Sequence, residues 1–376
     1  MTGIHTLNQI IADAASAPSA HNTQPWSPRM IGDGAAVELR VSRKRTLPAA
    51  DPSGRDTLLG LGAWLEAFSV SAAAHGVAFD VELLPALADP EAIVQARSDE
   101  PVLRIQLHHD TVSSADGDTT QHAESAFDPD SERRMLAARK TVRSGLEPAR
   151  GLVLELSGSL PEWLRLVPID ADDLRHFSSL GTADTLREPA VARELAPWLR
   201  RPPSHPRYTV DGRHAKALGS PAFATPGGAA VTRKRRLRDA AVGVAAPLGE
   251  LWRRVLLEVP VSAADEDAPA EATAFVLVAD TKLLDLGSGA EITRVLNSPL
   301  GLPPARVLEA GRALMRLWLR ATARGAAFAP ASEVIDSSLA QGELRYRLGL
   351  SRRDVPLFVT RVGVPRDAHP PRSPRR

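Results

Sequence analysis

The sequence predicts an α+β fold divided into two units, and three observations lead to this interpretation. Segments with helical periodicity alternate with short strand-like runs along most of the chain. The 376 residues are enough for one large or two ordinary domains. Residues 110–128 are rich in Asp, Ser, Thr, His and Gly, as an exposed linker would be. We therefore expect one unit at residues 1–115 and a second at 129–376.

The first unit is expected to open with an amphipathic helix over residues 4–16, which Pro18 must end because proline cannot continue a helix. Apolar residues recur there at helical spacing, at Leu7, Ile10, Ile11 and Ala14. The rest of the unit is predicted to contain a strand at 36–41, a helix at 55–75, and strands near 77–84 and 102–107. The pattern mixes helices and strands, as an α+β unit does.

The second unit has the same kind of pattern. Helices are predicted near 131–140, 171–199 and 304–324, and strands at 274–279 and 357–362. No short repeat is visible, but both units interleave strands with long helices, which is consistent with a coarse duplication. Residues 201–230 are rich in Pro, Gly and Ala and are too long for a simple connection, so they are either a lid or a disordered excursion.

The amino-acid composition excludes several kinds of reaction and binding partner. The chain has no cysteine, which excludes thiolate nucleophiles, disulfides and cysteine-ligated metal centres, so redox chemistry would need a bound cofactor. A net charge of +1 gives no reason to expect a nucleic-acid partner. No run approaches the eighteen or so apolar residues of a membrane span, and no leader-like segment opens the chain. We expect a cytoplasmic protein without a membrane partner.

Residues 17–26, Ala-Pro-Ser-Ala-His-Asn-Thr-Gln-Pro-Trp, are the most informative stretch. Two prolines bracket a short stiffened loop that carries hydroxyl, imidazole and amide groups. The polar side chains are those of Ser19, His21, Asn22, Thr23 and Gln24. Such a loop can present hydrogen bonds to a planar polar ligand. The alternative is a helix end followed by a turn, with Asn22 as turn former and Trp26 as ordinary core.

This stretch closely resembles the signature of the nitroreductase-like flavoproteins, a proline-serine-x-x-asparagine-x-glutamine-proline-tryptophan string that lies against flavin mononucleotide (FMN). The form found here is similar to that of a long, single-chain subgroup. Residues 43–55 extend the resemblance through an arginine, a leucine-proline pair and the run Asp51-Pro52-Ser53-Gly54-Arg55. That segment is either a ligand contact or a loop in which Asp51 or Ser53 caps the following helix.

Arginine suits a flavin phosphate because its planar fork matches the phosphate oxygens. The run Arg139-Lys140-Thr141-Val142-Arg143 resembles the arginine-arginine-serine-x-arginine opening of classical nitroreductases, which holds the phosphate and the ring edge. Arg139 and Arg143 would share a face if the run were helical. Ser144 and Gly145 replace the usual phenylalanine region, and a solvated basic helix end is the competing interpretation.

The carboxyl end adds two further parts to the resemblance. Val362-Gly363-Val364 and the terminal arginines Arg372, Arg375 and Arg376 resemble the family's closing strand and its phosphate-reaching basic segment, or else a frayed basic tail. The helix at 311–325 resembles the family's long central helix, suited to packing under a flavin or a neighbouring helix, and Pro330-Ala331-Ser332 would follow it at the ring.

The resemblance implies a nitroreductase-like fold of two pseudo-symmetric units that share one flavin site, in a chain that is a monomeric pseudo-dimer or a homodimer. The residues expected to bind FMN are Pro18, Ser19, Asn22, Gln24, Arg139, Lys140, Thr141, Arg143, Ser332, Arg372 and Arg375. Because the isoalloxazine carries the redox chemistry, no catalytic side chain is required, and Asn22 is a candidate for tuning the ring.

The function that the resemblance implies is FMN-dependent reduction of a small nitroaromatic or quinone-like acceptor, driven by NAD(P)H in a ping-pong cycle. The alternative is a protein that binds or sequesters flavin with little turnover. The histidines His108, His109 and His122 are weak metal candidates, since adjacent strand residues point to opposite faces. The basic run at 233–238 lacks interleaved aromatic residues, so a solvated helix face is expected there rather than a nucleic-acid site.

Overall fold

The computed structural model describes residues 3–95, 100–108, 128–143, 145–149, 151–198, 205–213 and 274–367. By the distribution of contacts, the chain forms two units that are interleaved in sequence. Unit 1 comprises Met1–Ala20, Gln24–Arg139 and Pro303–Leu319, and unit 2 comprises His21–Thr23, Lys140–Leu302 and Arg320–Arg376. The proposed halves at 1–115 and 129–376, and their pseudo-symmetry, stay predictions.

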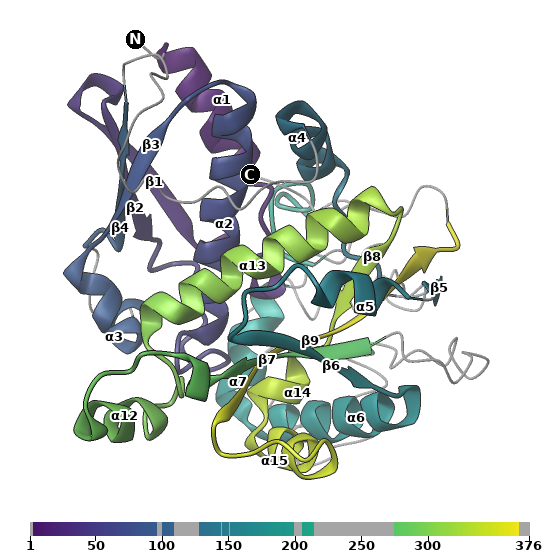
Figure 1. The fold of residues 1–376 in the computed structure, drawn as a ribbon. Coiled ribbons are helices and arrows are strands. Elements are labelled where there is room, and N and C mark those ends of the chain that lie inside the picture. Colours follow the sequence, from purple (N-terminus) through teal and green to yellow (C-terminus); the bar gives the residue numbers. More distant parts are fainter. Residues whose placement is uncertain are drawn as a thin grey trace. The chain divides into compact units, whose positions relative to one another are not determined.

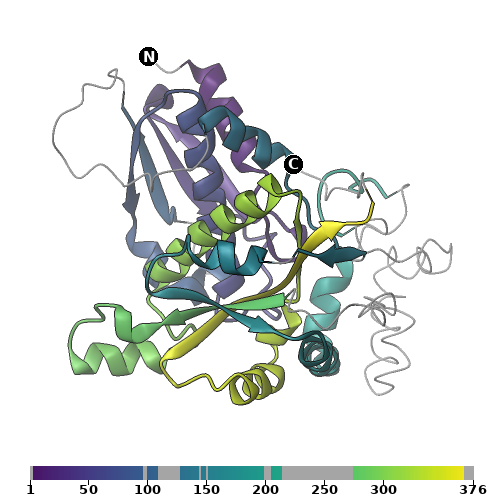
Figure 2. The ribbon, with the colours of Figure 1, turned by 45° about the vertical axis from the view of Figure 1, so that its right-hand side comes forward.

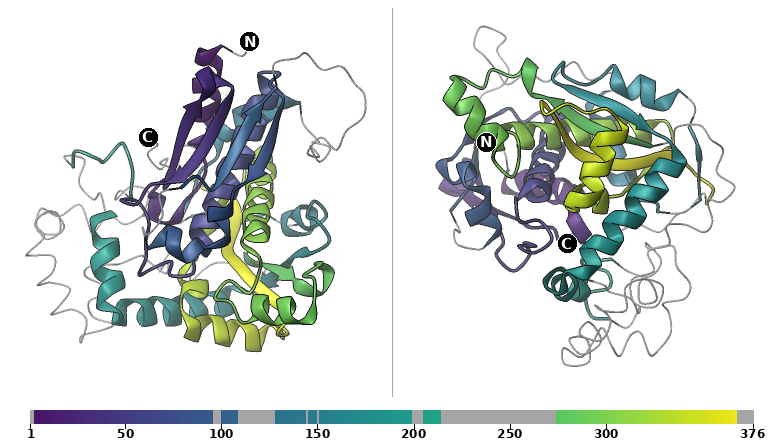
Figure 3. Two further views of the ribbon diagram at one scale, coloured as in Figure 1. Left: turned by 90° about the vertical axis from the view of Figure 1, so that its left-hand side faces the viewer. Right: turned by 90° about the horizontal axis from the view of Figure 1, so that it is seen from below.

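Unit 1 is a four-stranded antiparallel sheet with helices (Figure 1). Its strands are β1 (Trp26–Ile31), β2 (Ala36–Val41), β3 (Phe79–Leu83) and β4 (Leu103–Leu107), and its helices are α1 (Ile4–Ala14), α2 (Arg55–Ala74), α3 (Pro90–Val94), α4 (Pro129–Ala138) and most of α13 (Pro304–Ala323). The strand order is β1-β2-β4-β3, and the left view of Figure 3 shows the strands side by side. The predicted strand at 36–41 and helices near 4–16 and 55–75 are confirmed.

Helix α2 is the core of unit 1. All of its residues from Thr57 to Ala72 are buried, as expected for a helix that is apolar around its whole circumference. By length and composition alone α2 is also apolar enough to cross a membrane, a test that a buried core helix passes as well. Its aromatic side chains continue toward the sheet, where Phe68 meets Phe79 edge to face at 5.3 Å between ring centroids.

Helices α2 and α13 approach each other backbone to backbone. A Cβ atom placed on Gly62 of α2 would lie 2.0 Å from the carbonyl oxygen of Leu308, and one on Gly311 of α13 would lie 2.3 Å from that of Leu59. Small residues at both positions therefore allow the close contact. The sequence interpretation of 311–325 as a helix suited to close packing is confirmed, and in unit 1 the partner of its first part is the neighbouring helix α2.

Unit 2 contains a five-stranded sheet of order β5-β9-β7-β6, with β8 paired to β9 (Figure 2). Its strands are β5 (Leu146–Pro148), β6 (Leu164–Ile169), β7 (Ala274–Asp280), β8 (Ala327–Pro330) and β9 (Asp354–Pro365), and its helices are α5 (Leu152–Ser157), α6 (Ala171–Arg187), α7 (Pro189–Leu195), α12 (Gly289–Leu296), α14 (Glu333–Asp336) and α15 (Ser338–Arg347). Short 3-10 turns occur in both units: η2 (Gly32–Gly34) and η3 (Pro85–Ala88) belong to unit 1, η4 (Ala196–Trp198) and η8 (Thr281–Leu283) belong to unit 2, and η1 (Ala20–Asn22) has residues in each.

The core of unit 2 forms where α6, α14 and α15 pack on the sheet. Phe177, Val276, Val334, Leu344 and Val359 are buried together there. The α+β fold class is confirmed by this mixture of helices and antiparallel sheets. One local prediction is wrong: the helix expected at 171–199 is broken into α6 and α7 at Pro189. Helix α4 ends at Ala138, so residues 139–143 are not helical and the condition under which Arg139 and Arg143 would share a face is not met.

Candidate functional site

The loop that follows α1 has an unusual backbone. His21, Asn22 and Gln24 have φ angles of 48°, 54° and 52°, in the left-handed region that residues other than glycine rarely adopt. Each such residue costs on the order of 1–3 kcal/mol and persists where the surrounding structure enforces it, which is typical of ligand-binding sites. The loop is therefore ordered at an energetic cost, and its polar groups are held in fixed positions.

Within unit 1, Ser19 fastens the loop. Its hydroxyl oxygen accepts a hydrogen bond from the backbone N–H of Gln24 at 2.9 Å. The hydroxyl proton of Ser19 has no acceptor among the residues that the structure describes, so it remains available for a ligand. Trp26 is 5% exposed at the start of β1, in agreement with the interpretation of this residue as core.

Within unit 2, Asn22 is held by the backbone of Gly212. The side-chain amide of Asn22 donates to the Gly212 carbonyl at 3.2 Å, and the Gly212 N–H donates to the Asn22 carbonyl at 3.1 Å. The next residue, Arg213, donates its backbone N–H to the carbonyl of Trp198 at 2.8 Å. Of the segment 201–230 that the sequence suggested as a lid, only residues 205–213 are described, and they are anchored at these two points.

Arg139 and Arg143 fall in different units. In unit 1, the buried Arg139 donates to the carbonyl of Ser16 at 2.6 Å, and its guanidinium carbon lies 4.7 Å from the ring centroid of Trp318. Ser16 follows the carboxyl end of α1, where a cation is favourable. Arg139 therefore stabilises unit 1 whether or not it also binds a phosphate, and the shared helical face proposed for Arg139 and Arg143 does not exist.

Arg143 ends a segment that runs beside β8 in unit 2. Thr141 forms a parallel bridge with Phe328, and the N–H of Val142 donates to the Phe328 carbonyl at 3.0 Å. The Arg143 guanidinium then donates to the carbonyl of Pro330 at 3.2 Å. This pairing brings Thr141 and Arg143 to the 330–332 loop, whose Ser332 is half-buried and precedes α14.

Arg361 is a residue that the sequence interpretation missed. It lies on β9 opposite Ala329 of β8, and its guanidinium donates to the backbone carbonyl of Arg143 at 2.6 Å. The available signal was its position directly before Val362-Gly363-Val364, the segment that resembles the closing strand. Two arginines from distant parts of the chain, Arg143 and Arg361, are thus brought together in unit 2.

Several basic groups of unit 2 act on one another electrostatically at this point. Burial lowers the pKa of Arg143 and outweighs the opposing effect of Glu333. Burial, and then repulsion from Arg143, lowers the pKa of Arg361. Burial, followed by Arg213 and Arg143, holds the pKa of His21 well below its ordinary value of 6.5. These arginines therefore suit an anion, and His21 is neutral at physiological pH.

The structure divides the predicted cofactor residues between the units. Pro18, Ser19, Gln24 and Arg139 belong to unit 1, whereas Asn22, Lys140, Thr141, Arg143 and Ser332 belong to unit 2. Arg372 and Arg375 lie outside the described residues. Within unit 2, Arg143 and the 330–332 loop are brought together, and Arg361 joins them. The binding of FMN by these residues stays a prediction.

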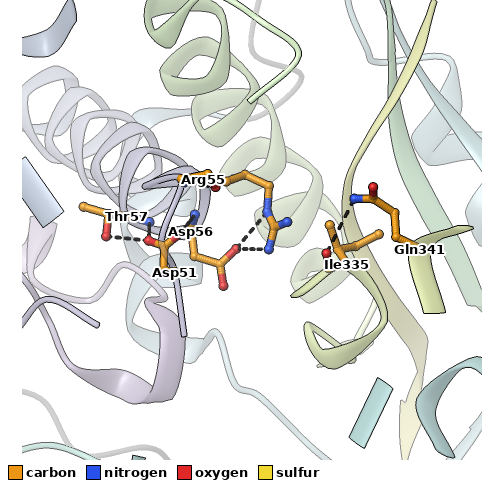
Figure 4. Close-up of polar contacts among 7 residues, drawn as sticks. Asp51, Arg55, Asp56, Thr57, Ile335 and Gln341 are labelled. Atoms are coloured by element: carbon orange, nitrogen blue, oxygen red, sulfur yellow. Dashed lines mark hydrogen bonds and ion pairs between the residues drawn. The ribbon is translucent and has the colours of Figure 1, made fainter. Parts of the chain in front are cut away.

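The 43–55 loop ends in a helix cap. The carboxylate of Asp51, 4% exposed, accepts hydrogen bonds from the backbone N–H groups of Asp56 and Thr57 and from the Thr57 hydroxyl, at 3.1, 2.8 and 2.8 Å (Figure 4). Arg55 forms an ion pair with Asp56 at 2.8 Å beside it. Asp51 thus caps α2, which agrees with the capped-loop interpretation of this motif.

The charge state of Asp51 gives a testable pH dependence. Burial, and then the neighbouring Asp56, raises the pKa of Asp51 from 3.8 to about 7. Because this pKa is higher in the folded than in the unfolded chain, the contribution of Asp51 to stability is largest below about pH 4 and is lost as the pH rises through 7. Between these pH limits the wild-type protein should lose on the order of 2–4 kcal/mol of unfolding free energy, and Asp51→Asn should not show this loss. Urea unfolding at several pH values measures both proteins. An unchanged pH profile in the variant would contradict the assignment.

Comparisons with known proteins add an independent observation. No protein-family model matches the chain. The chain is 47% identical over 90 residues to the Mycobacterium tuberculosis protein named "Putative NAD(P)H nitroreductase acg", a match that covers 24% of this chain and 27% of that protein. The resemblance to nitroreductases is confirmed over this stretch. The matched stretch spans only about a quarter of the relative's length.

Two further similarities are weaker. The chain is 39% identical over 74 residues to "Uncharacterized protein Rv3127" of the same organism, covering 18% of this chain and 21% of that one. A solved structure titled as a "putative nitroreductase" from Anabaena variabilis aligns with 88% of this chain and 69% of its own, at a TM-score of 0.33 and 10% identity.

Proposed function

We propose that the protein is an FMN-dependent oxidoreductase that takes electrons from NAD(P)H and passes them to a small electron-poor acceptor, such as a nitroaromatic compound or a quinone. The observation that carries the proposal is the group of Arg143, Arg361 and Arg213 beside His21 and Asn22 in unit 2. The local identity to a protein named as an NAD(P)H nitroreductase supports the reaction type.

The chemistry of these residues fits the parts of FMN. A phosphate dianion needs cations and donors, and the half-buried guanidinium of Arg143 donates a hydrogen bond to a main-chain carbonyl, that of Pro330. The polar edge of the ring needs directional donors and acceptors, and in unit 2 Asn22 supplies a side-chain amide on a backbone with a φ of 54°.

Bound FMN would supply the electron transfer, so the side chains of this chain have to bind and orient rather than react. The strained backbone at residues 21–24 fixes the donors before a ligand arrives, which reduces the ordering cost of binding. Arg143 is positioned by the Pro330 carbonyl and Arg361 by the Arg143 carbonyl. The chain offers no thiol that could compete as a redox group.

The test is flavin binding by the purified protein and by Arg143→Gln. We expect the wild-type protein to be yellow, and the variant to bind added FMN about ten- to a hundredfold more weakly, because one charge-assisted hydrogen bond is worth about 1.5–3 kcal/mol. Fluorescence quenching of FMN measures the affinity. The control is Arg324→Gln, which alters an exposed ion pair with Glu155 and should leave binding unchanged.

Two results would count against this assignment. Equal FMN affinity in wild type and Arg143→Gln would show that Arg143 does not hold the phosphate. A wild-type protein that neither retains flavin nor binds added FMN or riboflavin would reject the flavin-dependent function altogether.

A second candidate function is flavin binding or sequestration with little turnover. It is favoured by the two hydrogen bonds that fasten Gly212 to Asn22, since the segment 205–213 then occupies polar groups that a second substrate would approach. Anaerobic addition of NADPH separates the candidates. Rapid bleaching of the flavin absorbance supports the oxidoreductase, and an inert spectrum supports sequestration. We also propose, from composition alone, a cytoplasmic location.

A further inference from the structure

His21 is brought to the arginines of unit 2 by backbone pairing. The hydrogen bonds between Asn22 and Gly212 set two short segments side by side, so that His21 and Arg213 are the immediate neighbours of the paired residues. Arg143 and Arg361 are joined separately, through the Arg143 carbonyl and the register of β8 with β9. Arg143 lowers the pKa of both His21 and Arg361, which supports placing the two pairs near each other in unit 2.

One ring nitrogen of His21 is left unpaired within the part of the chain that the structure describes. This atom, Nδ1, is buried and has no hydrogen-bond partner among the residues that the structure describes. A buried polar atom left unpaired costs about 1–3 kcal/mol, and native structures satisfy nearly all such atoms with protein, water or a ligand. The residue also has a φ of 48°, a strained backbone conformation that the surrounding structure must maintain.

The charges around His21 determine what that partner can be. Arg213 and Arg143 face it from other segments, and Arg361 and Glu333 act on Arg143 in turn. A cation beside His21 would be repelled by the guanidinium groups of Arg213 and Arg143. A dianion would be attracted by them and would also reverse the electrostatic penalty on a protonated imidazole.

We propose that His21 is a proton-linked ligand of an oxyanion site in unit 2, shared with Arg143, Arg213 and Arg361, which takes a phosphate group. In the empty site the imidazole is neutral. When the anion binds, the imidazole takes one proton from the buffer, becomes an imidazolium, and donates a hydrogen bond to an anion oxygen. The phosphate is either that of FMN, in which case the inference deepens the proposed function, or free inorganic phosphate.

Histidine-selective carbon-13 NMR on the full chain tests this directly. Sulfate is the first probe because it has the tetrahedral shape of phosphate and keeps its charge across the pH range used. His21→Gln identifies the His21 signal by its loss and supplies a side chain that cannot titrate. We expect the His21 signal of anion-free protein to stay in its neutral position down to pH 6, and saturating sulfate to raise its titration midpoint by at least one pH unit.

Because sulfate binding is expected to be coupled to protonation of His21, the affinity for sulfate must also depend on pH. Sulfate should bind wild-type protein more tightly as the pH falls, approaching a tenfold gain for each pH unit by which the midpoint moves. His21→Gln should bind sulfate without this gain. A His21 midpoint that is the same with and without sulfate, or a variant that keeps the full pH dependence, would overturn the inference.

Two ligand arms separate the sources of the phosphate. If FMN moves the His21 signal, riboflavin does not, and sulfate no longer binds once FMN is present, the site holds the cofactor phosphate. If protein saturated with FMN still binds inorganic phosphate with a shift of His21, the site holds a separate anion. If the protein binds sulfate through His21 but binds no flavin, this inference stands and the proposed function is rejected. If it binds flavin but sulfate leaves the His21 signal unchanged, the inference is rejected and the proposed function stands.

Discussion

Gly311→Ala is expected to prevent the native packing of unit 1 and to lower its stability by about 3 kcal/mol or more. The added Cβ would lie 2.3 Å from the carbonyl oxygen and 2.8 Å from the Cα of Leu59. Both atoms belong to the backbone of α2, so no side-chain rotation can relieve the overlap. Gly62→Ala should behave alike, because its Cβ would meet the Leu308 carbonyl at 2.0 Å. Urea unfolding followed by circular dichroism measures the loss.

Gly342→Ala is the matched control for these substitutions. Gly342 lies on the exposed side of α15, and a Cβ there meets nothing within 4 Å among the described residues. Since alanine is the better helix former, we expect a gain of about 0.5–1 kcal/mol. A stability of Gly311→Ala within 1 kcal/mol of wild type would show that α2 and α13 do not approach so closely.

Glu66→Ala is expected to cost about 3–5 kcal/mol, because it would leave two arginines facing each other without their carboxylate. Glu66 is 6% exposed on α2 and accepts hydrogen bonds from Arg312 at 2.9 Å and from Arg316 at 2.6 and 3.1 Å. Burial raises the pKa of Glu66, but the two arginines outweigh this and leave it lowered below 4.5. The stabilisation should therefore be present above about pH 4.5 and be lost as the pH falls through the lowered pKa.

Two controls make the Glu66 test specific. Glu155→Ala removes the partner of Arg324 in an exposed pair and should cost no more than about 1 kcal/mol. Replacing Glu66 and both arginines together by apolar residues of similar volume should recover much of the loss, since buried ion pairs add little over well-packed apolar groups. A triple variant as unstable as Glu66→Ala would mean that packing, rather than the unpaired cations, determines the cost.

The parts of the fold that the sequence predicts well are those with a strong local pattern. Residues 36–41 alternate in the middle of a sheet, 55–75 form a long apolar helix and 304–324 a long amphipathic one, so their bounds agree with β2, α2 and α13 to within a residue or two. Strand β1 was missed because it pairs on one side only and carries Pro28 and exposed polar residues, which hide its alternation.

The candidate site is predictable only in part, for a physical reason. The loop at residues 18–26 carries its information locally, in prolines and amides, and a sequence resemblance finds it. The run 139–143 reads as a basic helix end, but pairing with β8 overrides that preference and draws it into extended backbone. Arg361 and Arg213 join Arg143 and His21 only through pairings between segments far apart in the sequence, and no local pattern reports them.

The interleaving of the two units affects how the chain can fold during translation. Unit 1 needs residues 303–319, whose helix α13 fills the space against α2, although the rest of the unit ends at Arg139. At about 5–20 residues per second, a ribosome would take roughly 9–36 s to synthesise the chain between these points. During that interval the apolar surface of α2 would remain uncovered by its partner, and nascent chains would be good substrates for holding chaperones.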